Sequence, residues 1–496
     1  MSTPTKRRPS SSSSTTAAGS RARSFLPTAT TTSAPPLGIP LLQLHCLGAV
    51  GHMATALDPT GVNSSGSRKR KCAAAGLASL HDDMLERVLA RLPPATFFRL
   101  RAFSRRWRHA AASATFRAAC AGVPDRDPWF LMLSDTNPSS DHDATKDPHS
   151  DEPARSPGAA VVFDSGERAW ARWRGGAPAG RGTVPVASAG GLVLYRDQTS
   201  GDLTVANPLT GATRALPSPP PAASTTALHA VAMYGSPYRV VLFLGDLPEL
   251  SMLAFDSSTN TWDAEPVALT RQHPAQHQHD AEPEDDDDGG GAVYFLSKSG
   301  DVVVSTTTYR APSRQYACAV TRRRSGPTTN DDDGSAEAVV AHFLSRSGTV
   351  VTVDVARRAF AELPRVHPAR HEHAIDVVAC GPACYAVVLS EFLGAASLRV
   401  WEFVVGGGGW RQVAAMPPAM ASAFVGAKAD VNCAGHGDRI MVCVTGSGEA
   451  NVNGCFLCDV KSNRWEELPR CVVGGDDDGG DLVAAVSLEP RMEAAV

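Results

Sequence analysis

The stretch LTVANPLTGATRALP, residues 203–217, contains the pattern that decides the fold. A short apolar run precedes the turn residue Asn207, and Arg214 and a Leu-Pro pair follow it. Asparagine and aspartate tolerate left-handed backbone and hydrogen-bond to their own main chain, so they favour a tight turn between two strands. Short apolar runs that alternate with such turns predict β-strands rather than helices.

The same plan recurs along the C-terminal two thirds of the chain. Its turn positions are Asp164, Asn207, Asp256, Asp354, Glu402 and Asp459, and the aromatic or arginine positions that follow are Trp170, Arg214, Trp262, Phe360, Trp410 and Trp465. Successive turn positions lie 43, 49, 98, 48 and 57 residues apart. A period of about 40–50 residues with several strands per unit is typical of a β-propeller.

The interval of 98 residues equals two periods and predicts a further unit within it. A self-similar pair supports this: FLSKSG at residues 295–300 and FLSRSG at residues 343–348 start 48 positions apart. Six and seven blades therefore both remain open. Trp262-Asp263 is the one Trp-Asp pair of the sequence, which favours a kelch-like over a WD-type repeat.

The repeat residues are expected to be structural. We expect the tryptophans to pack between adjacent blades, and the structural set is Trp170, Asn207, Pro208, Gly211, Trp262, Phe360, Trp410 and Trp465. The apolar run 482–488 is a strand that is expected to pair with the first blade and close the ring, which removes exposed sheet edges.

A different periodicity precedes the propeller. Apolar residues recur at helical spacing at Met84, Leu85, Val88, Leu89 and Leu92, and they predict an amphipathic helix between Ser79 and Pro93. Ser79 and Asp82 have the spacing of a capping box, and Pro93-Pro94 ends the helix. Shorter helices are expected over residues 96–103 and 104–112, with a helical turn at 115–121.

These patterns divide the chain into four parts. Residues 1–75 form a low-complexity leader expected to be disordered, 76–122 a helical domain, 123–158 a connecting segment, and 159–496 the propeller with an acidic disordered loop at 271–291. The leader has no acidic residue before Asp58, so it reads either as a transit peptide or as an extension upstream of Met53. The basic run at residues 68–71 is either a nuclear import signal or a solvated linker.

Composition excludes several classes of protein. The net charge of −4 provides no general attraction to nucleic acid or to anionic membranes. No stretch reaches the ~18–20 apolar residues of a membrane span. The eleven cysteines form no compact framework, which favours reduced thiols in the nucleus or cytoplasm.

The helical segment resembles an F-box over about 40 residues. The resemblance rests on the apolar helix face, the Pro93 stop and the tail that ends at Arg106-Trp107, and it departs at His81 and at Phe103-Ser104. The motifs DPWFLM (127–132), NPLTG (207–211) and LEPRME (488–493) resemble plant F-box/kelch-type proteins of the Hawaiian Skirt-like group. The fold class expected is thus a multidomain α+β chain, in which a small helical F-box precedes a kelch-like β-propeller.

The resemblance implies a substrate-recognition subunit of a Skp1–cullin–F-box (SCF) ubiquitin ligase. The F-box would dock on a Skp1-type adaptor, and through it on the cullin and RING subunits, while the propeller would hold an unknown target protein. The expected adaptor contacts are Leu80, Met84, Leu85, Val88, Leu89, Leu92, Pro93, Leu100, Arg101, Arg106 and Trp107. No catalytic residue, metal or cofactor is expected, and the expected location is the nucleus or the cytoplasm.

Two alternatives remain. The chain is a propeller scaffold without a ligase role, or a kelch-type oxidase, although its seven tyrosines form no convincing copper constellation. Cys455 and Cys458 are expected to be structural, because positions i and i+3 of a strand face opposite sides. The histidines and carboxylates of residues 273–288 are interpreted as an acidic loop. The basic run at 322–324 is read as a solvated loop, with an acidic or phosphorylated target segment as the alternative ligand.

Overall fold

A computed structural model of the chain describes residues 80–134, 160–172, 182–272, 293–296, 302–305, 315–324, 337–346, 348–366, 372–405, 408–426, 428–447, 453–471 and 482–496. All of them belong to one compact unit, Ala75–Val496. The leader, the basic run at 68–71 and the acidic segment after Gln272 lie outside the described residues. Within the described part of the chain, no helix is long and apolar enough to span a bilayer.

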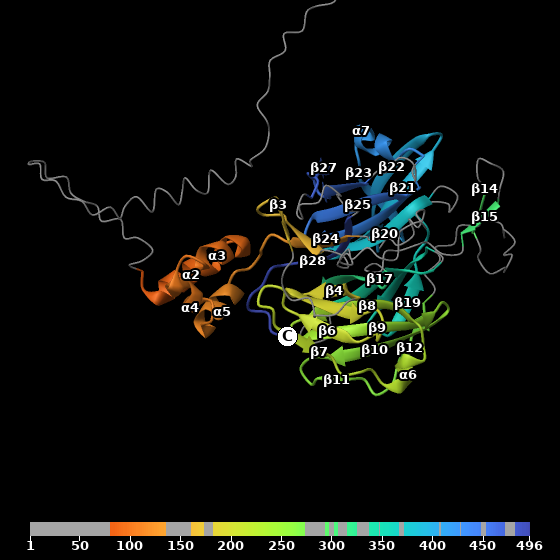
Figure 1. The fold of residues 1–496 in the computed structure, drawn as a ribbon. Coiled ribbons are helices and arrows are strands. Elements are labelled where there is room, and N and C mark those ends of the chain that lie inside the picture. The colour runs from red at the N-terminus through yellow and green to blue at the C-terminus, as the bar shows by residue number, and fades with distance from the viewer. Residues whose placement is uncertain are drawn as a thin grey trace, which may run out of the picture. The chain divides into compact units, whose positions relative to one another are not determined.

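Four short helices form the N-terminal domain (Figure 1). They are α2 (Asp82–Ala90), α3 (Pro94–Arg101), α4 (Arg105–Ala110) and α5 (Ala114–Ala121). The expected helices are confirmed, and two serine caps explain the later boundaries. The hydroxyl of Ser104 accepts the N–H of Trp107, and that of Ser113 accepts the N–H of Phe116, so each cap satisfies a free donor of a new helix.

The start of α2 differs from the expected capping box. Its N-cap is His81, and no side chain caps the helix there. Asp82 instead faces Arg106 of α4, at 2.6 Å between the carboxylate and the guanidinium. A contact between helices therefore holds the N-terminal end of α2, where a local cap was expected.

Most strands of the described residues form six blades of a β-propeller (Figure 1). The first blade contains β28 (Leu482–Leu488), β1 (Trp129–Ser134), β2 (Ala160–Asp164) and β3 (Ala169–Arg172), and the second contains β4 (Thr183–Ala189), β5 (Leu192–Asp197), β6 (Leu203–Ala206) and β7 (Thr213–Ala215). The third contains β8 (Leu228–Gly235), β9 (Tyr238–Asp246), β10 (Glu249–Asp256) and β11 (Thr261–Trp262), with β12 (Val267–Ala268) beside β10.

The other three blades repeat this antiparallel order. The fourth contains β16 (Ala319–Arg324), β17 (Glu337–Leu344), β18 (Val350–Asp354) and β19 (Ala359–Glu362), with β13 (Thr270–Arg271) parallel to β19. The fifth contains β20 (Glu372–Cys380), β21 (Ala383–Phe392), β22 (Ala395–Val404) and β23 (Gly409–Ala415), and the sixth β24 (Lys428–His436), β25 (Arg439–Ser447), β26 (Asn453–Asp459) and β27 (Arg464–Glu467). Short helices α6 (Pro221–Ser224), α7 (Pro418–Ala421) and η3 (Ser422–Phe424) lie in connections between blades.

The blade count corrects one expectation. Among the residues of the 98-residue interval that the structure describes, no additional blade is seen: β14 (Val293–Leu296) and β15 (Val302–Ser305) form a separate two-stranded sheet. The similar FLSRSG segment instead ends β17 and turns into β18. Local similarity therefore identified two hairpins, and only one of them belongs to a blade.

The propeller also begins earlier than expected. β1 lies within the supposed connecting segment and pairs with β28 on one side and β2 on the other. Trp129 lies opposite Leu488, which confirms that the C-terminal strand closes the ring. Because the first blade combines three strands from one end of the chain with one strand from the other, the ring closes without a free inner edge.

The turn residues act as the sequence suggested, with one difference. The Asn207 side chain accepts N–H groups of Leu209 and Thr210 at 2.9 and 3.2 Å. The left-handed residue, however, lies four positions after the turn residue, at Arg168, Gly211, Asn260, Arg358 and Asn463, with φ between 50° and 75°. The Asp or Asn thus anchors the turn, and a later position reverses the chain.

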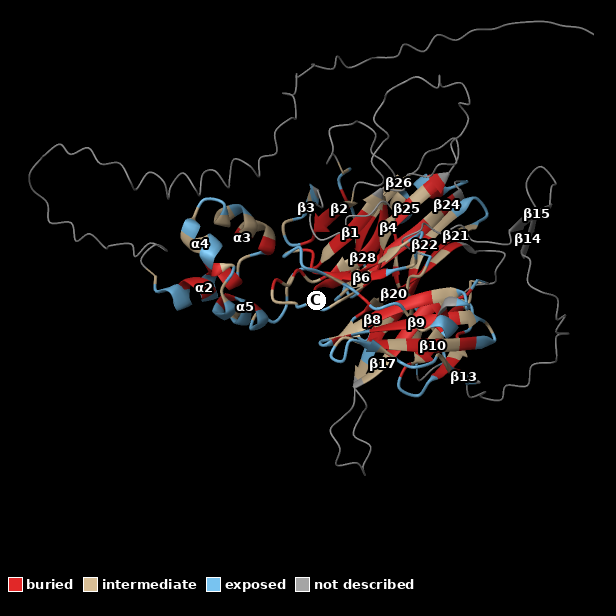
Figure 2. Ribbon diagram, turned by 60° about the horizontal axis from the view of Figure 1, so that its bottom comes forward, coloured by how far each residue is buried: buried red, intermediate tan, exposed pale blue. Residues whose placement is uncertain are grey.

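Apolar side chains fill the spaces between blades. Figure 2 shows buried residues along the strands and exposed residues at their connections. Phe243 and Phe343 meet between the third and fourth blades, with ring centroids 5.1 Å apart. At the rim, the indole N–H of Trp262 donates to the carbonyl of Pro217, and that of Trp410 to the carbonyl of Pro364. Trp262 and Trp410 therefore link adjacent blades through these hydrogen bonds.

Candidate functional site

The apolar stripe of α2 divides between the interior and the surface of the helical domain. Leu85 and Leu89 are each only 1% exposed and pack with Phe97 and Phe116. Met84 is 52% exposed and Val88 38%. The structure therefore places Leu85 and Leu89 in the core of the domain and leaves Met84 and Val88 available to a partner.

The other expected adaptor contacts are distributed in the same way. Leu80, Leu92 and Trp107 are half-buried and pack against the core of the helical domain, whereas Pro93 is exposed. Leu100 is half-buried near the end of α3. Contact of any of these residues with an adaptor stays a prediction.

The two arginines among the expected adaptor contacts, Arg101 and Arg106, make contacts within the domain. The guanidinium of Arg106 donates to the carboxylate of Asp82 and to the carbonyl of Leu80. The guanidinium of Arg101 lies 4.3 Å from the centre of the Phe98 ring, a cation–π distance. Arg106 therefore links α4 to the start of α2 through hydrogen bonds within the domain.

Phe103 is the residue that the sequence reasoning missed. It is 88% exposed in the connection between α3 and α4, although phenylalanine is normally buried. The available signal was its position, since Phe103-Ser104 is where the sequence departs from the F-box pattern. Met84, Val88 and Phe103 are the large exposed apolar side chains among the described residues of the helical domain.

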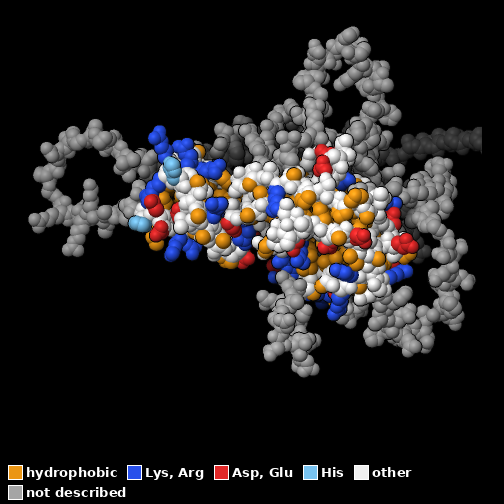
Figure 3. All heavy atoms as spheres, turned by 90° about the horizontal axis from the view of Figure 1, so that it is seen from below, with side chains coloured by type: hydrophobic (Ala, Val, Ile, Leu, Met, Phe, Trp, Pro, Cys, Tyr) orange, Lys and Arg blue, Asp and Glu red, His pale blue; other side chains and the backbone are white. Residues whose placement is uncertain are grey.

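The surface of the helical domain is strongly basic. Residues 77–118 contain eight arginines and three acidic residues. Figure 3 shows blue arginine side chains gathered over the helical end of the molecule. Exposed apolar groups within a cationic surface are suited to a partner that offers apolar pockets and carboxylates.

A C-terminal segment, residues 489–496, joins the helical domain to the propeller. Arg491 donates to the carbonyls of Val123 and Pro124, at 3.3 and 2.5 Å. Met492 is buried in the core cluster of the helices. From the propeller side, the Asn207 amide donates to the carbonyls of Arg491 and Ala494, at 3.0 and 2.8 Å.

Carboxylates on both sides hold Arg491 in place. Its guanidinium lies 2.6 Å from Glu489 and 3.0 Å from Glu493. Burial alone would raise the pKa of Glu489, but hydrogen bonds from His436 and Arg491 outweigh it and hold that pKa below its ordinary value. The ionised carboxylate is therefore part of the junction.

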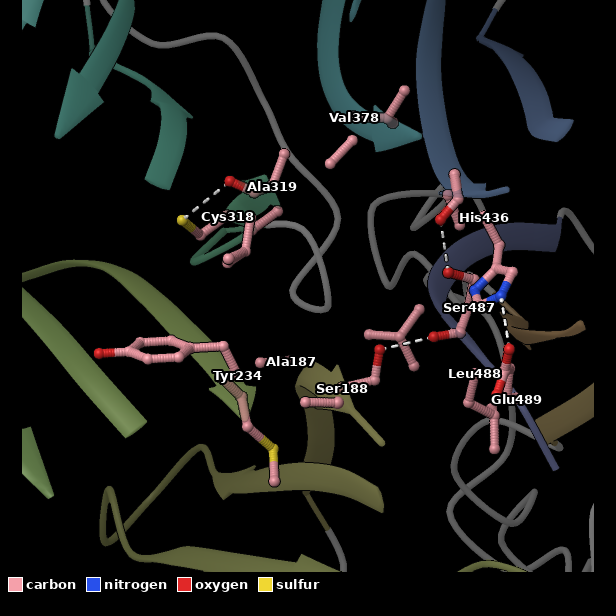
Figure 4. Close-up of a pocket in the computed structure, with 18 of the residues that line it drawn as sticks. Ala187, Ser188, Tyr234, Cys318, Ala319, Val378, His436, Ser487, Leu488 and Glu489 are labelled. Carbon is pink, nitrogen blue, oxygen red and sulfur yellow. Dashed lines mark hydrogen bonds and ion pairs between the residues drawn. The ribbon is translucent and has the colours of Figure 1, made fainter. Parts of the chain in front are cut away.

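A cavity of about 450 Å³ lies at the centre of the propeller and is lined by the inner strands of all six blades. Ser188 donates to the carbonyl of Ser487 at 2.6 Å, and the Ser487 hydroxyl donates to the carbonyl of Gly435 at 2.7 Å. Figure 4 shows these bonds beside the His436–Glu489 pair. The Ser188 and Ser487 side chains therefore link the inner strands of neighbouring blades.

The titratable groups near the cavity are poorly suited to covalent chemistry. Burial raises the pKa of Cys318 to about 12 and raises those of Cys380 and Cys384 above their ordinary values. Burial lowers the pKa of His342 to about 3, so its imidazole stays neutral. Protonated thiols are weak nucleophiles. Within the described ranges, no three metal-ligating side chains are grouped to hold an ion.

Comparison with protein-family models finds the F-box domain at residues 77–118. The chain is 36% identical over 427 residues to F-box only protein 13 of Arabidopsis thaliana, across 84% of this chain and 85% of that protein. It is 32% identical over 137 residues to F-box only protein 6 of the same plant, across 27% of this chain and 25% of that protein.

Two solved structures with a distant likeness illustrate this comparison. TolB of Acinetobacter baumannii gives a TM-score of 0.38 at 10% identity, over 78% of this chain and 73% of that chain. YCF48 of Cyanidioschyzon merolae gives 0.30 at 10% identity, over 63% and 78%. At these scores neither structure informs the function of this chain.

Proposed function

This chain belongs to the plant F-box protein family that includes F-box only protein 13, and from that premise we propose that it is a substrate receptor of an SCF ubiquitin ligase. The F-box binds a Skp1-type adaptor, which connects the receptor to the cullin and RING subunits. The propeller binds the protein to be modified. The receptor itself performs no covalent step.

The observation that carries this proposal is the exposure of Met84, Val88 and Phe103 on a four-helix domain of this family. Burying such side chains contributes ~1.5–3 kcal/mol each when they leave water completely. A helical domain that needed only to be stable would place them inside. Their exposure supports a protein partner that covers them.

The architecture also supports separate roles for the two domains, with adaptor binding by the F-box and target binding by the propeller. The C-terminal segment contacts both the helices and the propeller, so a protein bound to the propeller would be carried with the adaptor. The raised cysteine pKa values favour a binding role over a catalytic one. We also propose that the repeat is of the kelch type and that the protein resides in the nucleus or the cytoplasm.

The test is co-purification of the full chain with a Skp1-type adaptor. The double substitution Met84→Asp and Val88→Asp places charges on the exposed half of α2 and should abolish binding. Leu85 is unsuitable for this test, because a charge in the helical core would unfold the domain. The matched control is Phe392→Asp, an exposed aromatic of the propeller that is 61% accessible.

The results separate the alternatives. Loss of the adaptor in the double variant, with unchanged circular dichroism and normal binding by Phe392→Asp, supports the receptor. A folded wild-type chain that binds no Skp1-type adaptor refutes it and leaves a propeller scaffold. Phe103→Asp should weaken binding as the α2 variant does, since Phe103 is the most exposed phenylalanine of the helical domain.

A further inference from the structure

Two cysteine side chains of the sixth blade lie directly opposite each other. Cys443 of β25 and Cys455 of β26 are register partners on these antiparallel strands, which run side by side in Figure 2. Their sulfur atoms are 3.5 Å apart, and both residues are free cysteines. The pair therefore has two thiols in direct contact across a strand pair.

The main chain places these two cysteines at the closer type of cross-strand position. The carbonyl of Cys455 accepts the N–H of Leu468 at 2.9 Å, so the main-chain groups of Cys455 point away from β25. Cys443 and Cys455 are therefore a non-hydrogen-bonded pair, whose Cα atoms lie about 4.5 Å apart with their side chains close together. Disulfides span Cα separations of about 4.4–6.8 Å. The two strands are thus already close enough for a disulfide between these residues.

Cys458, the third cysteine of β25 and β26, lies on the other face of the sheet. It is buried among side chains of the fifth and sixth blades. Cys443 and Cys455 instead pack with side chains of the first and sixth blades. Positions i and i+3 of a strand face opposite sides. Cys458 is therefore no partner for Cys455.

The two thiols of the pair differ in their access to solvent. Cys455 is half-buried, whereas Cys443 is completely buried. Burial raises the pKa of the Cys443 thiol well above its ordinary value, and the contact with Cys455 adds to the rise. A dissolved oxidant therefore meets Cys455 first, and Cys443 lies beside it in the position of a resolving thiol.

We propose that Cys455 and Cys443 are a redox-modification site, at which hydrogen peroxide forms a reversible disulfide between them. The Cys455 sulfur attacks one peroxide oxygen, the O–O bond breaks, and the products are a sulfenic acid and water. The Cys443 sulfur then attacks the sulfenic sulfur, and the departing hydroxide takes the Cys443 proton and leaves as a second water. The two thiols lose two electrons, and one hydrogen peroxide is reduced to two waters.

The disulfide joins β25 to β26 beside the strands that close the ring. The pair packs in the same apolar cluster as Phe130 of β1 and Ala484 of β28. A disulfide restricts the unfolded states of the residues that it encloses, so the oxidised chain should resist unfolding better than the reduced chain. A dithiol restores both thiols by exchange. This site goes beyond the ligase role, and it acts whether or not the chain binds an adaptor.

Peptide mapping of the full chain tests the proposal. The folded, reduced protein is treated with hydrogen peroxide, its remaining thiols are blocked with iodoacetamide, and it is digested with trypsin and a glutamyl endopeptidase. Cleavage after Arg439, Glu449 and Lys461 yields peptide 440–449, which contains Cys443, and peptide 450–461, which contains Cys455. Mass spectrometry should find the two peptides joined, at two hydrogens below their summed mass, and dithiothreitol should separate them. The denaturant midpoint of the oxidised chain should exceed that of the reduced chain.

Substitutions assign the roles of the two sulfur atoms. Cys455→Ser should abolish both the joined peptides and the rise in the denaturant midpoint. Cys443→Ala should leave Cys455 as a sulfenic acid, which dimedone labels. Cys318→Ser is the matched control, because Cys318 is also half-buried but its sulfur contacts the carbonyl of Ala319. This control should oxidise as the wild type does, and circular dichroism shows that each variant is folded.

Three results would overturn the proposal. The first is that peptides 440–449 and 450–461 stay separate after peroxide treatment of the folded wild type. The second is a bond from Cys455 to Cys471, which packs beside the same cluster, in place of a bond to Cys443. The third is that joined peptides persist in Cys455→Ser, which would assign the bond to Cys458. Adaptor binding is measured separately, so none of these results bears on the proposed receptor role.

Discussion

The indole N–H of Trp170 donates a hydrogen bond to the carbonyl of Pro469 over 2.8 Å, although the two residues are 299 positions apart. Trp262 and Trp410 make the same bond to Pro217 and Pro364 of the blades before them. In each case the leucine before the proline is buried. The Leu-Pro element of the repeat is therefore an acceptor for the next blade, and Trp170 uses it to close the rim of the ring.

Replacing Trp170 by phenylalanine tests this bond. We expect Trp170→Phe to lower the free energy of unfolding by about 1 kcal/mol more than Trp465→Phe does. Trp465 is the matched control, because its indole nitrogen is buried and bonds to no residue that the structure describes, so the change removes no such bond. Denaturant unfolding of both variants measures the difference. Equal losses of unfolding free energy in the two variants would mean that the packing of the aromatic side chains joins the blades without a contribution from this hydrogen bond.

Removing β28 tests closure at the centre of the ring. A chain that ends at residue 481 lacks the inner strand of the first blade, so β1 presents an unpaired edge. Exposed strand edges promote association between chains. We expect this variant to aggregate in size-exclusion chromatography. A chain that ends at Leu488 keeps the strand and loses only the junction segment 489–496, so it should aggregate less than the 1–481 chain. A soluble folded 1–481 chain would refute the role of β28.

Arg491→Ala tests the junction between helices and propeller. The substitution removes the donors to Val123 and Pro124 and the partner of Glu489 and Glu493. We expect faster proteolytic cleavage between residues 122 and 128, with the propeller's unfolding temperature nearly unchanged. Arg464→Ala, an exposed arginine of β27, is the control. Equal cleavage of the two variants would show that Arg491 does not secure the junction.

The turn at Asp256 predicts a specific sensitivity to acid. Hydrogen bonds from the hydroxyl and backbone N–H of Ser258 lower the pKa of Asp256 from 3.8 to about 2. Because the pKa is lower in the folded chain, the ionised carboxylate stabilises the fold above pH 3.8, and this contribution disappears as the pH falls toward about 2. Asp256→Asn should therefore lose less stability over that interval than the wild type.

The substitution Asp256→Asn should preserve the turn. At the equivalent turn position of the second blade, the side-chain oxygen of Asn207 accepts the backbone N–H groups two and three residues later. Unfolding followed by circular dichroism at several pH values provides the measurement. Ser258→Ala should reduce the acid sensitivity in part, because it removes one donor to the carboxylate. Identical dependence of stability on pH in the wild type and both variants would contradict the assignment of this acid sensitivity to the Asp256 carboxylate.

Much of the architecture was predictable because its signals are local. The helices around Pro93 and Ser104, the turn at Asn207 and the strand at 482–488 each follow from neighbouring residues, whose spacing reflects helical or strand geometry. The F-box and the propeller were recognisable for the same reason.

The candidate site was only partly predictable. Leu85 and Met84 are adjacent, and helical periodicity places both on one broad apolar face. The packing of Phe97 and Phe116 decides that Leu85 is covered while Met84 is not. Arg106 likewise matched a motif, but its partner Asp82 lies 24 positions away.

By itself, the sequence determined the order of helices and strands, the repeat that builds blades and the family to which the chain is related. Only the tertiary structure decided that the ring has six blades, that β1 belongs to it and that Arg491 joins the two domains. The reason is physical: secondary structure depends on contacts between near neighbours. Ring closure and exposure depend on residues such as Trp170 and Pro469, which meet only when the whole chain has folded.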